Sequence, residues 1–344
     1  MSVPSCGTAE ASRPSALAVG FTHACVLRDH EVRCWGDDRF GQLGRGEASE
    51  VPRAPGPSVA MPAVVGVAAG GSSTCVLDDA GAVFCFGLGR HGQLGDGTLE
   101  MRATPTRVAA LPPASAISLG SDHACAIAAG DVYCWGWNGT GQAVPRERPR
   151  MPDDPSDVLV PTRVEGLPPM TEIVAGYLDT CARTAEGELV CWGAQHETPT
   201  SLGHARAVAI GVDHLCVVRE NTTTCFGAEP GGGRPALPPE GVTFTITGPV
   251  ARGAVDHLCM IDDAGEASCW GKNEHGQLGL GSQRFVEAPA RVPFDRPMRA
   301  IGVGVAFSCA LVEDDVLCWG NNEHGELGEP GALDAFSPTL VPRG

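Results

Sequence analysis

The chain has 344 residues, which is enough for two average domains or for one large repeat array. Glycine (46) and proline (28) together account for 74 residues, so many turns and little long helix are expected. The 24 basic and 41 acidic residues give a net charge of −17, which disfavours nucleic acid and anionic membrane surfaces as partners, because phosphate binding depends on Lys and Arg.

The first residues, 1–14, form a polar stretch that we expect to be disordered. This stretch has neither the charged nor the apolar region of a signal peptide, and no later run approaches the roughly 20 apolar residues of a membrane helix. The protein is therefore either cytosolic or a mature, processed form. In a processed form Cys6 could carry a lipid anchor; the alternative is that Cys6 has no role.

A Cys-aromatic-Gly triplet occurs seven times along the chain. The copies begin at Cys34, Cys85, Cys134, Cys191, Cys225, Cys269 and Cys318. Upstream of each lies a small apolar strand ending in glycine, at Gly20, Gly70, Gly120, Gly176, Gly211, Gly253 and Gly304. Successive glycines are 50, 50, 56, 35, 42 and 51 residues apart. A period near 50 with short strands and turn signals is typical of a β-propeller.

Each repeat contains four predicted strands, which in the third repeat lie at 105–108, 117–120, 123–127 and 132–135. We therefore predict an all-β, seven-bladed β-propeller with four-stranded antiparallel blades. The first repeat has no Pro-x-x-Val segment before it, whereas residues 337–342 form an extra segment of this type. We predict that this C-terminal strand completes the N-terminal blade and closes the ring of a single domain, residues 15–344.

A Gly-Gln-Leu-Gly loop follows the fourth predicted strand at 41–44, 92–95 and 276–279, becomes Gly-Glu-Leu-Gly at 325–328, and is degenerate at 141–144. His91, His275 and His324 precede three of these loops and are interpreted as loop structure. The longest connectors that do not repeat are 45–60, 145–160 and 228–243, which are loops by composition and a place where specificity could reside.

The pattern Gly-x-x-His-x-Cys, hairpin, Cys-Trp-Gly-x-Asn-x-x-Gly-Gln-Leu-Gly resembles the regulator of chromosome condensation repeat family over residues 15–343. The cysteine-rich form is similar to the bacterial branch of that family. The resemblance implies a seven-bladed β-propeller but not one activity. Members of the family include nucleotide-exchange factors for small GTPases, chromatin-binding proteins and secreted inhibitors.

Fourteen cysteines form seven pairs, one in each repeat. The pairs are Cys25/Cys34, Cys75/Cys85, Cys125/Cys134, Cys181/Cys191, Cys216/Cys225, Cys259/Cys269 and Cys309/Cys318. An interval of 9 leaves a two-residue turn, and an interval of 10 leaves a three-residue turn ending in glycine, so the two cysteines face each other in every repeat. We predict seven cross-strand disulfides within the blades; the alternative is buried thiols that pack as small apolar side chains.

A histidine stands two residues before the first cysteine in four repeats, at positions 23, 123, 214 and 257. A His-x-Cys strand directs both side chains to one face, where they could contribute ligands to a zinc site. Three repeats have Ser73, Asp179 or Phe307 instead, and a fourth ligand is missing. We therefore predict no metal site and no cofactor, and expect these side chains to hydrogen-bond the backbone.

Five tryptophans share one position of the repeat with Phe86 and Phe226, which predicts packing between blades. The sixth, Trp137, breaks the pattern and is the best candidate for an exposed partner-binding anchor, because tryptophan is favoured at binding hot spots. The alternative is that its side chain folds back over the blade. Asn138 and Asn221 match the glycosylation pattern, which is frequent by chance.

No sequence motif for catalysis was found: there is no Gly-x-Ser-x-Gly elbow, no phosphate loop and no His-Glu-x-x-His. Acidic pairs such as Asp78-Asp79 and Asp262-Asp263 suggested a glycosidase, but they fall at hairpin turns, where aspartate is a turn former. We predict a protein without enzymatic activity.

The composition and the repeats together favour a protein-binding propeller that recognises a protein of unknown identity through one rim of loops. We expect it to be a monomer, disulfide-stabilised, and secreted, periplasmic or on the cell surface. The alternative is a guanine-nucleotide exchange factor-like regulator of a small GTPase, for which 228–243 would be the candidate insertion. Chromatin binding is disfavoured by the net charge of −17.

Overall fold

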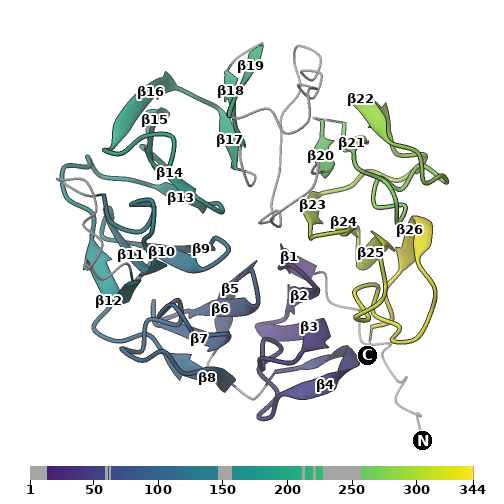
Figure 1. Ribbon diagram of the computed structural model, residues 1–344, viewed down its shortest axis with the longest axis horizontal. Coiled ribbons are helices and arrows are strands. Elements are labelled where there is room, and N and C mark those ends of the chain that lie inside the picture. The colour runs from purple at the N-terminus through teal and green to yellow at the C-terminus, as the bar shows by residue number, and fades with distance from the viewer. Residues whose placement is uncertain are drawn as a thin grey trace, which may run out of the picture.

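The structure is a computed structural model that describes residues 14–58, 61, 63–145, 157–210, 214–219, 222–227, 257–262 and 264–343; at 14, 15, 209, 214, 216 and 222–227 it describes the backbone only. Within these ranges the chain forms strands and turns, with no helix and therefore no helical membrane span. The strands build separate antiparallel sheets, and Figure 1 shows these sheets arranged as the blades of a propeller around a central axis.

Seven sheets follow one another along the chain, five with four strands and two with three described strands. The strands are β1 (Pro14–Val19), β2 (His23–Arg28), β3 (Glu31–Asp38) and β4 (Ser49–Pro57); β5 (Val64–Gly70), β6 (Ser73–Asp78), β7 (Val83–Gly87) and β8 (Arg102–Arg107); β9 (Ala116–Leu119), β10 (His123–Ala128), β11 (Asp131–Trp137) and β12 (Asp157–Arg163); β13 (Glu172–Ala175), β14 (Asp179–Arg183), β15 (Glu188–Gly193) and β16 (Thr200–His204); β17 (Ala207–Ile210), β18 (His214–Arg219) and β19 (Thr222–Gly227); β20 (His257–Ile261), β21 (Ala267–Gly271) and β22 (Val286–Arg291); β23 (Ala300–Val303), β24 (Phe307–Val312), β25 (Asp315–Gly320) and β26 (Ala335–Leu340).

The order of strands within a blade differs from the prediction. The Pro-x-x-Val segment at 105–108 was predicted to begin a blade, but β8 pairs with β7 and therefore ends the preceding sheet. The same holds for β12, which pairs with β11. Among the described strands, the apolar strands β1, β5, β9, β13, β17 and β23 are thus the first of their sheets and lie nearest the centre (Figure 1), and the described proline-containing strands are the outermost.

Proline explains why this strand is at the edge. Cys85 pairs with Thr106 on β8, and Pro105 immediately precedes Thr106. At every other described outer strand the residue that pairs with the second cysteine of the blade also follows a proline: Pro55, Pro161, Pro199, Pro289 and Pro338. Cys75 and Cys85 are a close, non-hydrogen-bonded pair, so Cys85 bonds Thr106 on its other side and Pro105 directs its nitrogen outward. A proline there removes a donor that another strand would otherwise use.

The predicted closure by the C-terminal strand is wrong. Thr339 on β26 pairs with Cys318 on β25, so the last strand completes the last sheet, and β1–β4 form a complete sheet without it. First and last sheets meet by packing: Trp35 and Ala24 lie in one apolar cluster with Phe307. Because β4 supplies the outer strand of the first blade, no strand needs to be exchanged.

The hydrophobic core lies between neighbouring sheets. Seven clusters of buried side chains join the sheets pairwise around the ring, including one between the last sheet and the first. The aromatic residue of each Cys-aromatic-Gly triplet fills this space: Trp35, Phe86, Trp135, Trp192, Trp270 and Trp319 are all buried. The predicted inter-blade role of these aromatic residues is confirmed for this set; Phe226 lies outside the described side chains.

Six disulfides join the second and third strands of their blades, in agreement with the prediction: Cys25–Cys34, Cys75–Cys85, Cys125–Cys134, Cys181–Cys191, Cys259–Cys269 and Cys309–Cys318. Their Cα atoms are 4.0–4.1 Å apart. The two turn types keep the pairs opposed: Asp29 and His30 have positive φ in a two-residue turn, and Gly81 has φ 82° in a three-residue turn. Cys216 and Cys225 are aligned in the backbone register, and their side chains lie outside the described residues.

Residues 1–13, the connector 228–243 and Asn221 also lie outside the described residues. The predictions of N-terminal disorder, of a lipid anchor at Cys6 and of an exchange-factor insertion at 228–243 are therefore untested.

Candidate interaction face

Two sets of loops lie on the same face of the ring. In the first sheet His23 begins β2 and pairs with Gly36 near the end of β3. The turn from first to second strand and the loop from third to fourth strand must therefore leave the sheet at the same end. We call the third-to-fourth connections the exit loops, and the side of the ring that carries both sets the exit-loop face.

Four described exit loops are built by two polar side chains each, and the loop after β7 by the second of them alone. The first is an Asn or Asp whose side-chain oxygen accepts the backbone amide hydrogen of the residue five positions later, at 2.9–3.1 Å. The acceptors are Asp38, Asn138, Asn273 and Asn322, and the donors are Leu43, Ala143, Leu278 and Leu327 in the same order. A buried Gln or Glu accepts the amide hydrogen two positions earlier, at Gln42, Gln93, Gln142, Gln277 and Glu326. The repeated Asn and Gln residues thus shape the loops; they are not free to bind a ligand.

The exit loops also connect neighbouring blades. Gly46 N donates to Ala103 O at 2.8 Å, and Gly281 N donates to Phe336 O at 2.7 Å, in each case on the outer strand of the next sheet. His91 Nδ1 lies 3.2 Å from Asp157 Oδ2, and His275 Nδ1 lies 3.0 Å from Asp334 Oδ2. The interpretation of these two histidines as loop structure is consistent with these contacts.

The buried histidines pair with hydroxyl groups of the next sheet, whereas we had expected bonds to the backbone. His23 Nε2 is 2.9 Å from Thr74 Oγ1, His123 Nε2 is 2.8 Å from Thr180 Oγ1, and His257 Nε2 is 2.9 Å from Ser308 Oγ. The signal was present in the sequence: the hydroxyl residue follows the position that His23 occupies, one repeat later. Reading each repeat by itself missed it. His214 lies outside the described side chains.

Burial keeps these three histidines neutral. Desolvation lowers the pKa of His23 to about 4, of His123 to about 3 and of His257 to about 4. The described part of the chain contains no cluster of three or more His, Cys, Asp or Glu side chains that could hold a metal ion.

Trp137 lies at the end of β11, half-buried, between aromatic side chains of two neighbouring blades. Its ring centroid is 6.4 Å from that of His91 and 6.5 Å from that of Tyr177, with tilted planes. Its indole also covers Gly139, where any Cβ would overlap the six-membered ring. The side chain therefore folds over its own exit loop and still exposes part of its surface. This arrangement is intermediate between the exposed anchor and the folded-back side chain that the sequence left open.

Charged groups flank this aromatic cluster. Asp157 pairs with Trp137 across β11 and β12, and Asp122 O accepts the amide hydrogen of Trp137 at 2.7 Å. Arg90, whose side chain is 62% exposed, lies 3.6 Å from Asp122. Half-buried aromatic rings beside exposed charges are typical of a protein-binding surface.

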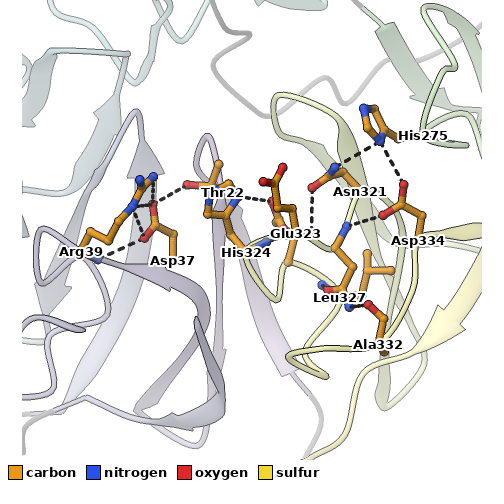
Figure 2. Close-up of polar contacts among 12 residues, drawn as sticks. Thr22, Asp37, Arg39, His275, Asn321, Glu323, His324, Leu327, Ala332 and Asp334 are labelled. Carbon is orange, nitrogen blue, oxygen red and sulfur yellow. Dashed lines mark hydrogen bonds and ion pairs between the residues drawn. The ribbon is translucent and has the colours of Figure 1, made fainter. Parts of the chain in front are cut away.

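Two polar networks face each other across the seam between the last and first sheets on the same face, and Asp37 and His324 interact electrostatically between them (Figure 2). Arg39 holds the buried Asp37 through both carboxylate oxygens, at 2.9–3.2 Å, and lowers its pKa although burial opposes this. Thr22 Oγ1 donates to the same carboxylate at 3.2 Å. His324 interacts with Glu326, whose carboxylate raises the pKa of the imidazole. Arg39 remains 43% exposed, so part of its network faces solvent.

Several sequence candidates are removed by the structure. Asp78 and Asp262 accept amide hydrogens inside their own hairpin turns, as expected for turn formers. The Asn138 side chain is buried and bonded to Ala143 and Val144, so it is not an accessible glycosylation acceptor. One surface pocket of about 350 Å³ lies between Pro168 and His204 on the opposite face, beside hairpin residues.

The RCC1-like domain matches residues 3–343. The chain belongs to this family. RCC1 domain-containing protein RUG3, mitochondrial, of Arabidopsis thaliana is 28% identical over 86% of this chain and 62% of the relative. The ultraviolet-B receptor UVR8 of the same plant is 26% identical over 78% of this chain and 55% of the relative. The secretion-regulating guanine nucleotide exchange factor of Bos taurus is 28% identical over 86% of this chain and 64% of the relative.

The chain spans between half and two thirds of the length of these relatives. Among solved structures, Prp20p from Saccharomyces cerevisiae has a TM-score of 0.72 at 17% identity, with 96% of this chain and 87% of that chain covered. The CRINKLY WD40 ectodomain of the Arabidopsis thaliana receptor kinase ACR4 has a TM-score of 0.53 at 16% identity, with 94% and 98% covered. These two structural likenesses show the β-propeller fold.

Proposed function

We propose that this RCC1-like propeller is a non-enzymatic protein-binding module that recognises its partner through the exit-loop face. We also propose that all seven sheets form complete blades of one closed ring. The observation that carries the binding proposal is the Trp137 cluster: one exit loop departs from the repeat by placing a half-buried tryptophan between His91 and Tyr177 of the neighbouring blades.

The chemistry of the exit-loop face supports binding over catalysis. Its repeated polar side chains build the loops, and the Trp137 cluster lies beside the exposed Arg90 and the largely buried Asp122 and Asp157. Tryptophan supplies a large contact area at low entropic cost, and flanking charges provide orientation. The structure of the relative Prp20p is described together with its binding to Gsp1p and histones, which is consistent with a family of protein binders.

We further propose an oxidising compartment for the mature protein. Six disulfides are described, each buried and each in a different sheet, and such bonds persist in secreted or periplasmic proteins but are rare in the cytosol. Secretion, a lipid anchor at Cys6 and a bacterial source remain parts of this proposal; the relatives named above are eukaryotic.

The test is co-purification from the native host with the wild-type protein, a Trp137→Ala variant and a Leu340→Ala control. Leu340 is 53% exposed and pairs with Leu317, at the end of β26 that lies away from the exit loops. Quantitative mass spectrometry should show a partner that is retained by the wild type and the control and lost at least tenfold with Trp137→Ala. Equal retention by both variants would refute the role of Trp137.

A second candidate function is nucleotide exchange on a small GTPase, supported by the exchange-factor relative. A fluorescent-nucleotide release assay against a panel of small GTPases separates the two. Catalytic acceleration of release at substoichiometric protein would favour exchange; binding without acceleration would favour the binding module.

A further inference from the structure

The exit loop that follows Trp137 is hydrogen-bonded to the next sheet at the backbone carbonyl of Gln142 and, at 3.0 Å, from Thr140 Oγ1 to Leu178 O. Gln142 O accepts the hydroxyl hydrogen of Thr180 at 2.8 Å and the indole hydrogen of Trp192 at 3.0 Å. Thr180 lies on β14 and Trp192 on β15. The position of this loop therefore depends on close contact between the β9–β12 sheet and the β13–β16 sheet.

His123 completes this chain of hydrogen bonds and is fixed in one tautomer. Thr180 has a single hydroxyl hydrogen, which it gives to Gln142 O, so its oxygen must accept from His123 Nε2. The hydrogen of the neutral ring is thus on Nε2, and Nδ1 is bare. Nδ1 is buried and has no hydrogen-bond partner among the residues that the structure describes. A second ring proton would be a buried donor without an acceptor.

The backbone of two sheets closes over the ring. A Cβ at Gly120 would overlap both the His123 ring and the carbonyl oxygen of Gly176, so there is no room for the imidazole to turn in place. The charged groups on the adjoining elements are occupied: Asp122 contacts Arg90 and Ser121, and Asp179 accepts the amide hydrogen of Gln195 at 2.9 Å. Burial is the cause that lowers the pKa of His123 to about 3.

We propose that His123 makes the Trp137 loop acid-sensitive: protonation of the ring parts the seam between these two sheets, frees Gln142 from Thr180, and weakens partner binding. The first two steps concern the chain alone. The last step rests on the proposed function.

The size of the effect follows from the difference between the closed and the parted seam. In the parted seam the ring is solvated and regains an ordinary pKa of about 6.5. The ratio of parted to closed populations is therefore roughly 30-fold higher at pH 5 than at pH 8. At the His23–Thr74 and His257–Ser308 pairs the hydroxyl likewise donates to an exit-loop carbonyl, of Gln42 and Gln277. They provide internal comparisons.

The chain also contains a seam without this pair. Where the last sheet meets the first, Phe307 occupies the histidine position and Ala24 the hydroxyl position, within one apolar cluster. The double substitution His123→Phe/Thr180→Ala copies this arrangement and removes the titrating ring. His123→Gln is a second variant, because its amide can donate to Thr180 without titrating.

The test is hydrogen exchange of the Ser121 amide, which bonds Gly176 O across this seam, at pH 7 and pH 5, corrected for the intrinsic pH dependence of exchange. The wild type should lose roughly 20- to 30-fold of its protection at pH 5. In either variant this loss should disappear, while the Phe21 amide, which bonds Gly71 O across the seam of His23, still responds. Unchanged protection in the wild type, or an equal loss in both variants, would overturn the acid step.

The partner step is measured separately. The partner that co-purifies at pH 7.5 should elute from immobilised wild-type protein at pH 5 and be retained by His123→Gln. Elution from both proteins, or from neither, overturns the link between His123 and binding. Failure of the proposed function itself would show instead as equal retention by Trp137→Ala and the wild type at pH 7.5.

Discussion

Trp35 on β3 donates its indole hydrogen to the backbone carbonyl of Glu326, 2.8 Å away across the seam between the first and last sheets. The same bond recurs at other seams, from Trp135 to Gln93 O and from Trp319 to Gln277 O. The closing seam is therefore built like an internal one, although no strand is shared across it. This explains how a ring can close when β26 stays in its own sheet.

Replacing Trp35 with Phe tests the closing seam. Phe86 occupies the same position natively, so the fold tolerates the smaller ring, but the variant loses the bond to Glu326 and leaves a cavity. We expect the free energy of unfolding to fall by about 2 kcal/mol, measured by chemical denaturation. Trp137→Phe, at a half-buried site, is the control and should change it by less than about 0.5 kcal/mol. No loss in Trp35→Phe would show that this seam does not limit stability.

The oxidation state of the cysteines can be counted directly. Alkylation under denaturing, non-reducing conditions followed by intact mass measurement should modify at most one thiol, that of Cys6 where it carries no lipid, because six pairs are bonded in the structure and the backbone aligns Cys216 with Cys225. Each bridge closes a short loop and should add about 2–3 kcal/mol before strain. Fourteen additional modified thiols would contradict the disulfides and the proposed oxidising compartment.

Acid should destabilise the fold in a defined pH window. The folded pKa values of His23, His123 and His257 lie at about 4, 3 and 4, below the unfolded value of 6.5, so the unfolded chain binds more protons between these limits. The neutral rings make their full contribution to the free energy of unfolding above pH 6.5, and this contribution is lost as the pH falls toward 4. We expect about 1 kcal/mol per pH unit for each histidine, measured by urea unfolding between pH 7 and 4.5.

His324 acts in the opposite sense. Its folded pKa is raised by Glu326, so its contribution is complete below pH 6.5 and is lost as pH rises through the folded value. A maximum of stability near neutral pH is the combined expectation. The triple variant His23→Gln/His123→Gln/His257→Gln should flatten the acidic side and leave the basic side unchanged; an unaltered acidic slope would show that other groups cause it.

The edge prolines predict a monomer. Restoring an outward backbone donor with Pro105→Val, Pro161→Val and Pro289→Val together should produce concentration-dependent association in sedimentation equilibrium, because open strand edges pair with one another. Pro112→Val, in the connection between β8 and β9, is the matched control and should remain monomeric. If the triple variant also stays monomeric, the prolines are not what prevents edge pairing.

The repeat predicted the strands, the facing cysteines and the buried aromatic residues because each is fixed by local spacing. It could not predict where a blade begins, since a circular repeat has no intrinsic first strand. The position of Pro105 contained that information, because proline belongs at an edge. The His123–Thr180 pair required two repeats to be read together. For Trp137 the sequence showed only a departure from the pattern; its neighbours His91 and Tyr177 come from other blades.

The central claim is that the exit-loop face binds the partner, and a hydrogen-exchange footprint of the complex tests it most directly. The account predicts that partner binding slows exchange in residues 88–97, 121–122, 137–144 and 177–178, around Trp137. It predicts no change in the hairpin turns on the opposite face, such as those at Asp79 and Gly187. Protection confined to those hairpin turns, with the Trp137 loop unaffected, would contradict it.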